Sequence, residues 1–279
     1  MGTYIQLKPK LEQNVYGIPV YIESNDDDNM MQGKVYGIIH HPFKKIRDTL
    51  LAPGNWCEIT PQHFNIKACT YLPRDGFCEL TFYTGRKYYE APDDVYQLVY
   101  RFTKTKDEEN YFRINLTAEK GPLGTADYQI EVEAVPLEGN RTFIYFSYSY
   151  KYNFLTSLGM NTYLATLGSG KIGFSVIGDD EQGKPVYIDG IRGIIERNAI
   201  RYYLAIQSYL DTLDTQPSKQ FYERINKWFD LTEKYHQQLY EMDKKDYIKY
   251  KQQERKDQAR LQENVNSKIL PESQCREKQ

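Results

Sequence analysis

The residues best suited to chemistry in this sequence lie in one arginine-rich stretch. Arg197 and Arg201 are four residues apart, so a helix would place them one turn apart, with Glu196 and Asn198 alongside and Arg192 just before them. A guanidinium group can pair with two oxygens at once, which suits the carboxylate or phosphate head group of a ligand. The alternative is a set of salt bridges at a surface or a sheet edge, and the sequence leaves both interpretations open.

Aromatic and acid–base side chains form a second group. The chain has 26 tyrosines, an excess that suits half-buried strands and pocket walls, where a ring packs and its hydroxyl stays hydrogen-bonded. Tyr148, Tyr150 and Tyr152 alternate along one run and would form either a pocket wall or plain core. In a catalytic pocket, a tyrosine, His63 or Glu196 would be the acid–base group.

Other patterns resemble known sites but lack their context. Gly168, Gly170 and Gly173 spell GxGxxG, but a dinucleotide site needs a strand before the glycines and a helix after them, and here the predicted order is reversed. The acidic run at residues 25–29 lacks the spacing of a calcium loop and favours a solvated loop. The histidines at 40–41 precede a helix without a nucleophile motif, which favours a capping or surface role. We therefore predict no cofactor.

The four cysteines suggest a disulfide rather than a metal site. No CxxC motif occurs, and the histidines are not spaced with the cysteines as zinc ligands, so we predict no metal. Cys57 ends a short predicted helix and Cys69 lies on the first strand of a predicted meander. A disulfide between them would attach that helix to the sheet, although two buried thiols are the alternative.

Composition narrows the range of partners. The chain has 36 basic and 38 acidic residues, a net charge of −2, which offers no overall field to attract nucleic acid. Mean hydropathy is −0.70, and no apolar run approaches the ~20 residues that a membrane span needs. The first residues show no basic segment followed by an apolar one, so the given chain carries no predicted signal peptide.

The longest regular pattern is a β-meander over residues 66–152, where apolar residues alternate with polar ones and turn-forming residues separate the runs. One face of this antiparallel sheet is predicted to be covered and the other solvated. Residues on the covered face include Phe112, Ile114, Ile130, Phe146, Tyr148 and Tyr150.

Helical periodicity precedes and follows the meander. A helix begins near Pro42, and a short one carries Trp56. After the meander we expect a helix with Met160 and Leu164 on its apolar stripe, then a hairpin of residues 171–177 and 186–191. The most regular helix, residues 194–213, places Tyr202 and Ile206 on its apolar stripe.

Three regions follow from these patterns. Residues 1–33 are predicted to be an N-terminal extension, with a polar start and a short edge strand at 19–23, and residues 34–215 the main domain. Residues 216–279 are predicted to be a helical extension. Its stripe of Phe221, Ile225, Trp228 and Leu239 should pack on the domain, while the part after Asp243 should be a solvated, fraying helix that becomes disordered from about Asn264.

Five segments resemble one family: HPFKKIRDTLLAPGNWCEI, NIKACTY, GPLGTADYQIEVEAVPL, SYSYKYN and IRGIIERNAIRYYLAIQSYLDTL. Over residues 17–250 the chain is similar to the START/Bet v 1-like (SRPBCC, helix-grip) superfamily, and in particular to uncharacterised bacterial members that are usually exported. The resemblance implies an α+β fold in which a curved antiparallel sheet grips a long C-terminal helix around a cavity, here with an inserted hairpin and an appended helical tail. It implies a periplasmic or otherwise exported protein, with the cytoplasm as the alternative, and it does not name a substrate.

We therefore expect binding of a hydrophobic or amphipathic, lipid-like small molecule, with the protein acting as carrier or sensor. The alternatives are an enzyme of the same fold and an interaction module whose C-terminal helices dock a protein partner. The predicted ligand-binding residues are Phe112, Ile114, Ile130, Phe146, Tyr148, Tyr150, Arg197, Arg201, Tyr202 and Ile206.

Overall fold

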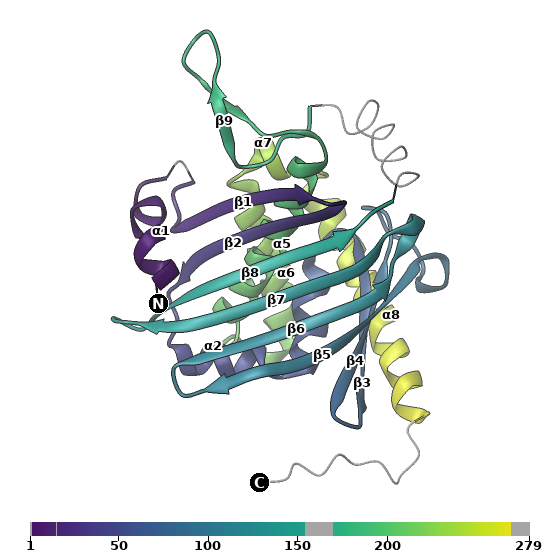
Figure 1. Cartoon of the computed structure of the whole chain (residues 1–279). Coiled ribbons are helices and arrows are strands. Elements are labelled where there is room, and N and C mark those ends of the chain that lie inside the picture. The colour runs from purple at the N-terminus through teal and green to yellow at the C-terminus, as the bar shows by residue number, and fades with distance from the viewer. Residues whose placement is uncertain (1, 15, 154–169, 269–279) are drawn as a thin grey trace.

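The protein is an α+β molecule built on one curved antiparallel sheet, as a computed structural model shows (Figure 1). The structure describes residues 2–14, 16–153 and 170–268. Eight strands form the sheet in the order β1-β2-β8-β7-β6-β5-β4-β3, and every neighbouring pair is antiparallel. The helix α5 (Gly190–Asp211) lies against one face of this sheet, and α6 (Pro217–Glu233) packs on α5. The predicted helix-grip arrangement is confirmed.

The meander has the predicted period of two. Leu116 and Ile130 on the inner face are fully buried, whereas Gln97 and Arg101 on the outer face are exposed. The strands of the sheet are β1 (Val20–Asp27), β2 (Met30–Ile39), β3 (Ile66–Arg74), β4 (Phe77–Thr84), β5 (Tyr96–Glu108), β6 (Tyr111–Lys120), β7 (Ala126–Leu137) and β8 (Arg141–Lys151).

The N-terminal residues contribute to this sheet and its cover, and the edge strand expected at residues 19–23 is present as β1. The strand β1 pairs with β2 along its whole length. Asp28 and Asn29 connect them with positive φ angles, the conformation that a tight two-residue hairpin requires, so the acidic run is a strand end and a turn rather than a loop. The helix α1 (Gly2–Glu12) packs Leu11 against Ile38 and Phe143 at the outer face.

Two short helices connect the first hairpin to the meander and close one end of the inner face. They are α2 (Phe43–Leu50) and α3 (Pro53–Ile59), followed by the 3-10 turn η1 (Thr60–Gln62). Ile46 and Trp56 are fully buried, and the indole N–H of Trp56 donates to the carbonyl of Leu50. Further 3-10 turns are η2 (Pro92–Asp94) and η3 (Pro122–Gly124).

The long helix α5 (Gly190–Asp211) lies across the inner face, mainly against β1, β2 and β8. Its close approach to β2 requires glycine at two positions. A side chain at Gly33 would meet the backbone of Ile195, and one at Gly37 would meet the ring of Tyr203. The hairpin before α5 comprises β9 (Val176–Asp179) and β10 (Pro185–Tyr187). The predicted helix with Met160 and Leu164 lies outside the described residues.

The C-terminal helices α6 (Pro217–Glu233), α7 (His236–Leu239) and α8 (Lys244–Ser267) pack on the domain. As expected, Trp228 is fully buried, and its indole N–H donates to the carbonyl of Arg201. The expectation of a solvated, fraying helix after Asp243 is wrong, because α8 runs along the free edge of β3 and continues to Ser267. It buries Lys251 and Glu254 among other residues.

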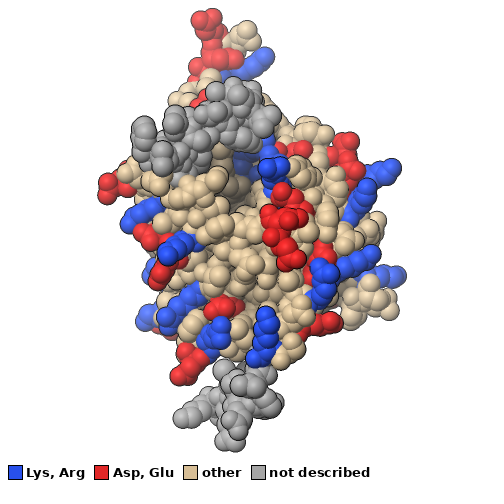
Figure 2. Space-filling model, turned by 90° about the vertical axis from the view of Figure 1, so that its right-hand side faces the viewer, with Lys and Arg blue, Asp and Glu red and all other residues tan. Residues whose placement is uncertain are grey.

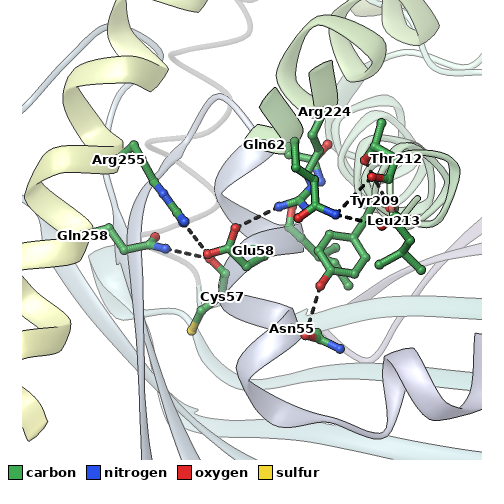
Figure 3. Close-up of polar contacts among 12 residues, drawn as sticks. Asn55, Cys57, Glu58, Gln62, Tyr209, Thr212, Leu213, Arg224, Arg255 and Gln258 are labelled. Carbon is green, nitrogen blue, oxygen red and sulfur yellow. Dashed lines mark hydrogen bonds and ion pairs between the residues drawn. The ribbon is translucent and has the colours of Figure 1, made fainter. Parts of the chain in front are cut away.

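A carboxylate of α3 joins the two long C-terminal helices (Figure 3). Glu58 accepts a hydrogen bond from Arg224 of α6 at 2.8 Å and pairs with Arg255 of α8. Gln258 of α8 donates to the carbonyl of Cys57 at 2.8 Å. Among the described residues, no helix is long and apolar enough to cross a membrane.

Candidate ligand-binding cavity

A cavity of about 230 Å³ lies between the inner face of the sheet and α5. Strands β3, β4, β5, β7 and β8 contribute its wall on one side, and α5 contributes two residues on the other. The described residues that line it are His63, Asn65, Ile66, Phe82, Thr84, Leu98, Tyr100, Pro122, Tyr128, Tyr148, Asn198 and Tyr202. The wall is therefore largely aromatic. It also carries hydroxyl, amide and imidazole groups, and none of the described lining residues is acidic.

His63 is the most constrained polar group of the cavity. The side chain is 3% exposed, and its Nδ1 accepts a hydrogen bond from the backbone N–H of Asn65 at 3.1 Å, so the neutral ring carries its proton on Nε2. Nε2 is fully enclosed, and hydrogen bonding from the side chain of Asn198 beside it acts to raise the pKa of the ring. Burial, followed by the positive charges of Arg201 and Lys251, lowers the pKa of His63 well below its usual range. The imidazole is therefore a neutral N–H donor.

Tyrosines form most of the aromatic wall. Tyr202 stacks on His63 with ring centres 4.9 Å apart, and Tyr148 lies 5.6 Å from Tyr202. Burial raises the pKa of Tyr100, Tyr148 and Tyr202, and it raises that of Tyr128 to about 12, so all four phenols keep their protons at neutral pH. The Tyr128 hydroxyl is hydrogen-bonded to Thr125 at 2.7 Å. Within the described ranges the hydroxyls of the other three make no hydrogen bond.

The structure brings only Tyr148 and Tyr202 of the ten predicted ligand-binding residues to the cavity. Six of the others are apolar or aromatic side chains of the packed core, because strands and helix meet closely over most of the inner face. These are Phe112, Ile114, Ile130, Phe146, Tyr150 and Ile206. Of the two interpretations of the tyrosine run, Tyr148 fits the pocket wall and Tyr150 fits the core.

Arg197 and Arg201 are placed in a buried ion cluster, which matches the salt-bridge interpretation rather than a head-group anchor. Both guanidinium groups pair with Glu241, which follows α7, and Lys171 pairs with the same carboxylate at 2.9 Å. Lys87 is a fourth partner. Although burial alone would raise the pKa of Glu241, the charges of these cations hold it well below its usual range.

Glu196, the other acid–base candidate, does not line the cavity. Its carboxylate is fully buried and accepts hydrogen bonds from the Ser24 and Ser175 hydroxyls and from the backbone N–H groups of Phe174 and Ser175. It therefore attaches the segment before β9 to α5 and β1. His41 pairs with Asp211 at 2.9 Å on the surface. Cys57 and Cys69 form a disulfide in the structure.

Sequence reasoning identified His63 as an acid–base candidate but missed the other polar residues of the wall. Tyr100 and Tyr128 belong to the predicted covered face, and Asn198 is one turn before Tyr202 on α5, so period and spacing could have pointed to them. No local signal marks Asn65, which follows η1. Among the described residues, no group of His, Cys, Asp and Glu is arranged to hold a metal ion.

Charge is mixed on the side of the molecule that lies to the right in Figure 1. Figure 2 shows Lys and Arg side chains interspersed with Asp and Glu, and neither sign covers a broad area of the described part of that face. The same view shows a hollow near its upper end, with basic and acidic side chains close to it.

Comparison with known proteins finds similar solved structures but no sequence family. No protein-family model and no curated protein matches the chain. A conserved protein of unknown function from Enterococcus faecalis is 12% identical over 75% of this chain and 89% of its own, with a TM-score of 0.38. Human StAR-related lipid transfer protein 5 is 12% identical over 59% of this chain and 86% of its own, with a TM-score of 0.32.

A third similar structure is the Zhui aromatase/cyclase from Streptomyces sp. R1128. It is 12% identical over 43% of this chain and 67% of its own, with a TM-score of 0.32. At these values the similarities do not assign a function.

Proposed function

We propose that the protein binds a small amphipathic molecule in the cavity between the sheet and α5, as a carrier or sensor. The observation that supports this is an aromatic cavity in which the hydroxyls of Tyr100, Tyr148 and Tyr202 make no hydrogen bond among the described residues. Hydroxyls that line a cavity and lack a protein partner favour an occupant that can form hydrogen bonds with them.

The size of the cavity favours a smaller ligand than the lipid-like molecule expected from the sequence. An apolar cavity of about 150 Å³ holds benzene, whereas pockets for drug-sized ligands span about 300–1,000 Å³. A volume of about 230 Å³ therefore suits a molecule of one or two rings, and an acyl chain or a sterol would need the walls to move apart.

Binding is favoured over catalysis by the state of His63. A general base at neutral pH needs a pKa near the working pH, and here burial and neighbouring cations lower the pKa well below it. The interaction-module alternative has less support than binding, because the apolar residues Ile225, Trp228 and Leu239 of the C-terminal helices are buried in the domain itself. Export stays a proposal, which the resemblance and the Cys57–Cys69 disulfide support.

The test compares two tryptophan substitutions on one strand. Leu98 of β5 lines the cavity, whereas the next residue, Val99, is 48% exposed on the outer face. Leu98→Trp should fill the cavity, and Val99→Trp is the matched control. Ligand-observed NMR with a library of one- and two-ring amphipathic compounds, together with native mass spectrometry of the protein from its own cells, should detect ligands that bind the wild type and the control but not Leu98→Trp. If nothing binds, or if Leu98→Trp binds equally well, the proposal is wrong.

A further inference from the structure

A second hollow, the outer groove, lies on the face of the sheet opposite to α5. Its volume is about 280 Å³; strands β2, β6, β7 and β8 contribute most of its lining, and Thr3 of α1 also lines it. Tyr36, Tyr145 and Glu133 are direct cross-strand neighbours on β2, β8 and β7, and Arg113 of β6 continues the row. The groove therefore follows a row of side chains that the register of four strands brings together.

Aromatic rings form much of the lining of the outer groove. They are Tyr36, Tyr111, Phe143 and Tyr145. The ring centres of Tyr36 and Tyr145 are 5.1 Å apart, and those of Tyr36 and Phe143 are 6.4 Å apart. The face of an aromatic ring carries partial negative charge, so a group of rings around a hollow can attract a cation.

One ammonium group of the chain itself binds to this row of rings. Tyr21 stacks on Tyr36 with ring centres 6.0 Å apart. Nζ of Lys10 lies 4.4 Å from the centre of the Tyr21 ring and donates to its hydroxyl at 3.3 Å. The tyrosines of the outer face thus hold an ammonium group through both a ring and a hydroxyl.

Two carboxylates add negative charge to the outer groove. Glu131 is 9% exposed and pairs with Arg113, whereas Glu133 accepts from the Tyr111 hydroxyl at 2.9 Å and lies 3.7 Å from the same guanidinium. In the described ranges Arg113 is the cation that pairs with these two carboxylates, so two negative charges share one positive charge. None of the described residues that line the groove is basic.

The hydroxyl groups of the groove respond to this negative charge. Burial raises the pKa of Tyr145 most, and three carboxylates, the two of the groove and Glu23, raise it further. Burial and the carboxylate of Glu133 raise the pKa of Tyr111 to about 12, and the opposing charge of Arg113 has a smaller effect. A field that disfavours a phenolate favours a positive charge beside these hydroxyls.

We propose that the outer groove binds a small primary amine in its protonated form. The ammonium group lies beside the carboxylate of Glu133 and the rings of Tyr36 and Tyr145, and the organic part of the amine packs on Phe143. An ammonium group suits this site because carboxylate oxygens accept from its N–H groups while the rings attract its charge. The site is separate from the inner cavity, so the inference goes beyond the proposed function and does not rest on it.

Benzylamine and benzyl alcohol separate the effect of charge from that of shape. Benzylamine is protonated at about pH 7, and benzyl alcohol has the same ring without the charge. Calorimetry and ligand-observed NMR should show that benzylamine binds wild-type protein at least about fivefold more tightly. A cation–π contact and a partly exposed ion pair together contribute about that factor.

Two variants then locate the ammonium group. Glu133→Gln keeps the size of the side chain but leaves Arg113 balanced by one carboxylate, and it should weaken benzylamine binding at least about threefold while changing benzyl alcohol binding little. Glu119→Gln, at an exposed position near the end of β6, is the matched control and should change neither. Tyr145→Leu removes a ring and should weaken benzylamine binding more than benzyl alcohol binding. Because Glu133 is only half-buried, its variant tests the inference even if Tyr145→Leu does not fold.

Leu98→Trp distinguishes the outer groove from the inner cavity, because Leu98 lines the cavity and not the groove. This variant should bind benzylamine as wild type does. If Leu98→Trp abolishes benzylamine binding, the amine occupies the inner cavity and the assignment to the groove is wrong. The inference also fails if wild type does not bind benzylamine, if benzyl alcohol binds as tightly, or if Glu133→Gln leaves benzylamine binding unchanged. These three failures leave the proposed function of the inner cavity unaffected.

Discussion

At the scale of single residues, Glu241 has an unusual concentration of partners. The side chain is 4% exposed, and its four cations come from three segments: Lys87 from the loop after β4, Lys171 from the segment before β9, and Arg197 and Arg201 from successive turns of α5. One carboxylate therefore holds together parts of the chain that are up to 154 residues apart. Removing such a charge leaves its buried partners uncompensated, which costs more than the pair itself contributes.

Glu241→Gln should lower the free energy of unfolding by about 3–5 kcal/mol, because Arg197 and Arg201 would remain buried without their counter-charge. Urea denaturation measures the change. Glu263→Gln, on the exposed side of α8, is the control and should have little effect. A loss of less than about 1 kcal/mol at Glu241 would show that the cluster is solvated.

Lys251 gives a prediction for pH. Burial lowers its pKa from 10.5 to about 8 in the folded protein, although the Glu254 carboxylate at 2.7 Å acts in the opposite direction. Between pH 8 and 10 the unfolded chain therefore binds a proton that the folded chain lacks. The free energy of unfolding should rise with pH in this window, by at most about 1.4 kcal/mol per pH unit, relative to a Lys251→Met variant.

The pH dependence of wild type and Lys251→Met should be compared with that of a control variant that keeps Lys251. Lys249→Met alters an exposed lysine of the same helix and should keep the wild-type dependence on pH. Parallel curves for wild type and Lys251→Met would contradict the lowered pKa.

At the scale of elements, α8 protects the open edge of the sheet. Gln258 accepts from the backbone N–H of Cys69 at 2.8 Å, and Gln262 both accepts from the N–H of Tyr71 and donates to its carbonyl. Four residues of helix rise about 6 Å and two residues of strand advance about 6.7 Å, so amides one turn apart match alternate strand residues. Side chains of a helix thus make the hydrogen bonds that a ninth strand would make.

Replacing both glutamines by alanine should expose this edge. We expect a loss of about 1–3 kcal/mol in the free energy of unfolding, mostly from the buried Gln258, together with concentration-dependent self-association detected by light scattering. Gln252→Ala, on the exposed side of α8, is the control and should change neither property. A variant that stays monomeric with full stability would show that the edge is protected by other contacts.

At the scale of the whole molecule, the disulfide between Cys57 and Cys69 connects α3 to the first strand of the meander. The two residues are 12 apart in sequence, and closing a loop of this length contributes about 2–3 kcal/mol. Oxidised wild type should therefore melt at a higher temperature than reduced wild type. Peptide mass mapping without reductant should recover the two cysteines as one cross-linked pair.

A variant without either sulfur tests the cause of this difference. Replacing Cys57 and Cys69 by alanine should abolish the response of the melting temperature to reductant. If alkylation labels both thiols in protein that was never reduced, the disulfide does not form under those conditions.

Most of the fold follows from local patterns. The alternation of residues 66–152 predicts a sheet with one covered face, and the stripe of residues 194–213 predicts the helix that covers it. Such patterns predict which residues share a face, because the direction of a side chain follows from its position along a strand or helix. The burial of the C-terminal helix could not be predicted in this way. Lys251, Glu254 and Gln258 are polar residues typical of a solvated helix face, and their hydrogen-bond partners come from distant parts of the chain.

The cavity and its chemistry depend on contacts between distant segments. Period two places Tyr128, Tyr148 and Tyr150 on the same face, but only the position of α5 leaves the first two beside a cavity and packs Tyr150 into the core. Arg197 and Arg201 have the spacing of an anion site, but both guanidinium groups pair with Glu241, a residue far along the chain. His63 lies in a sequence with no motif, and its neutral state follows from burial and from neighbouring charges. Burial and electrostatic environment are sums over the whole folded chain, so they have no local signature in the sequence.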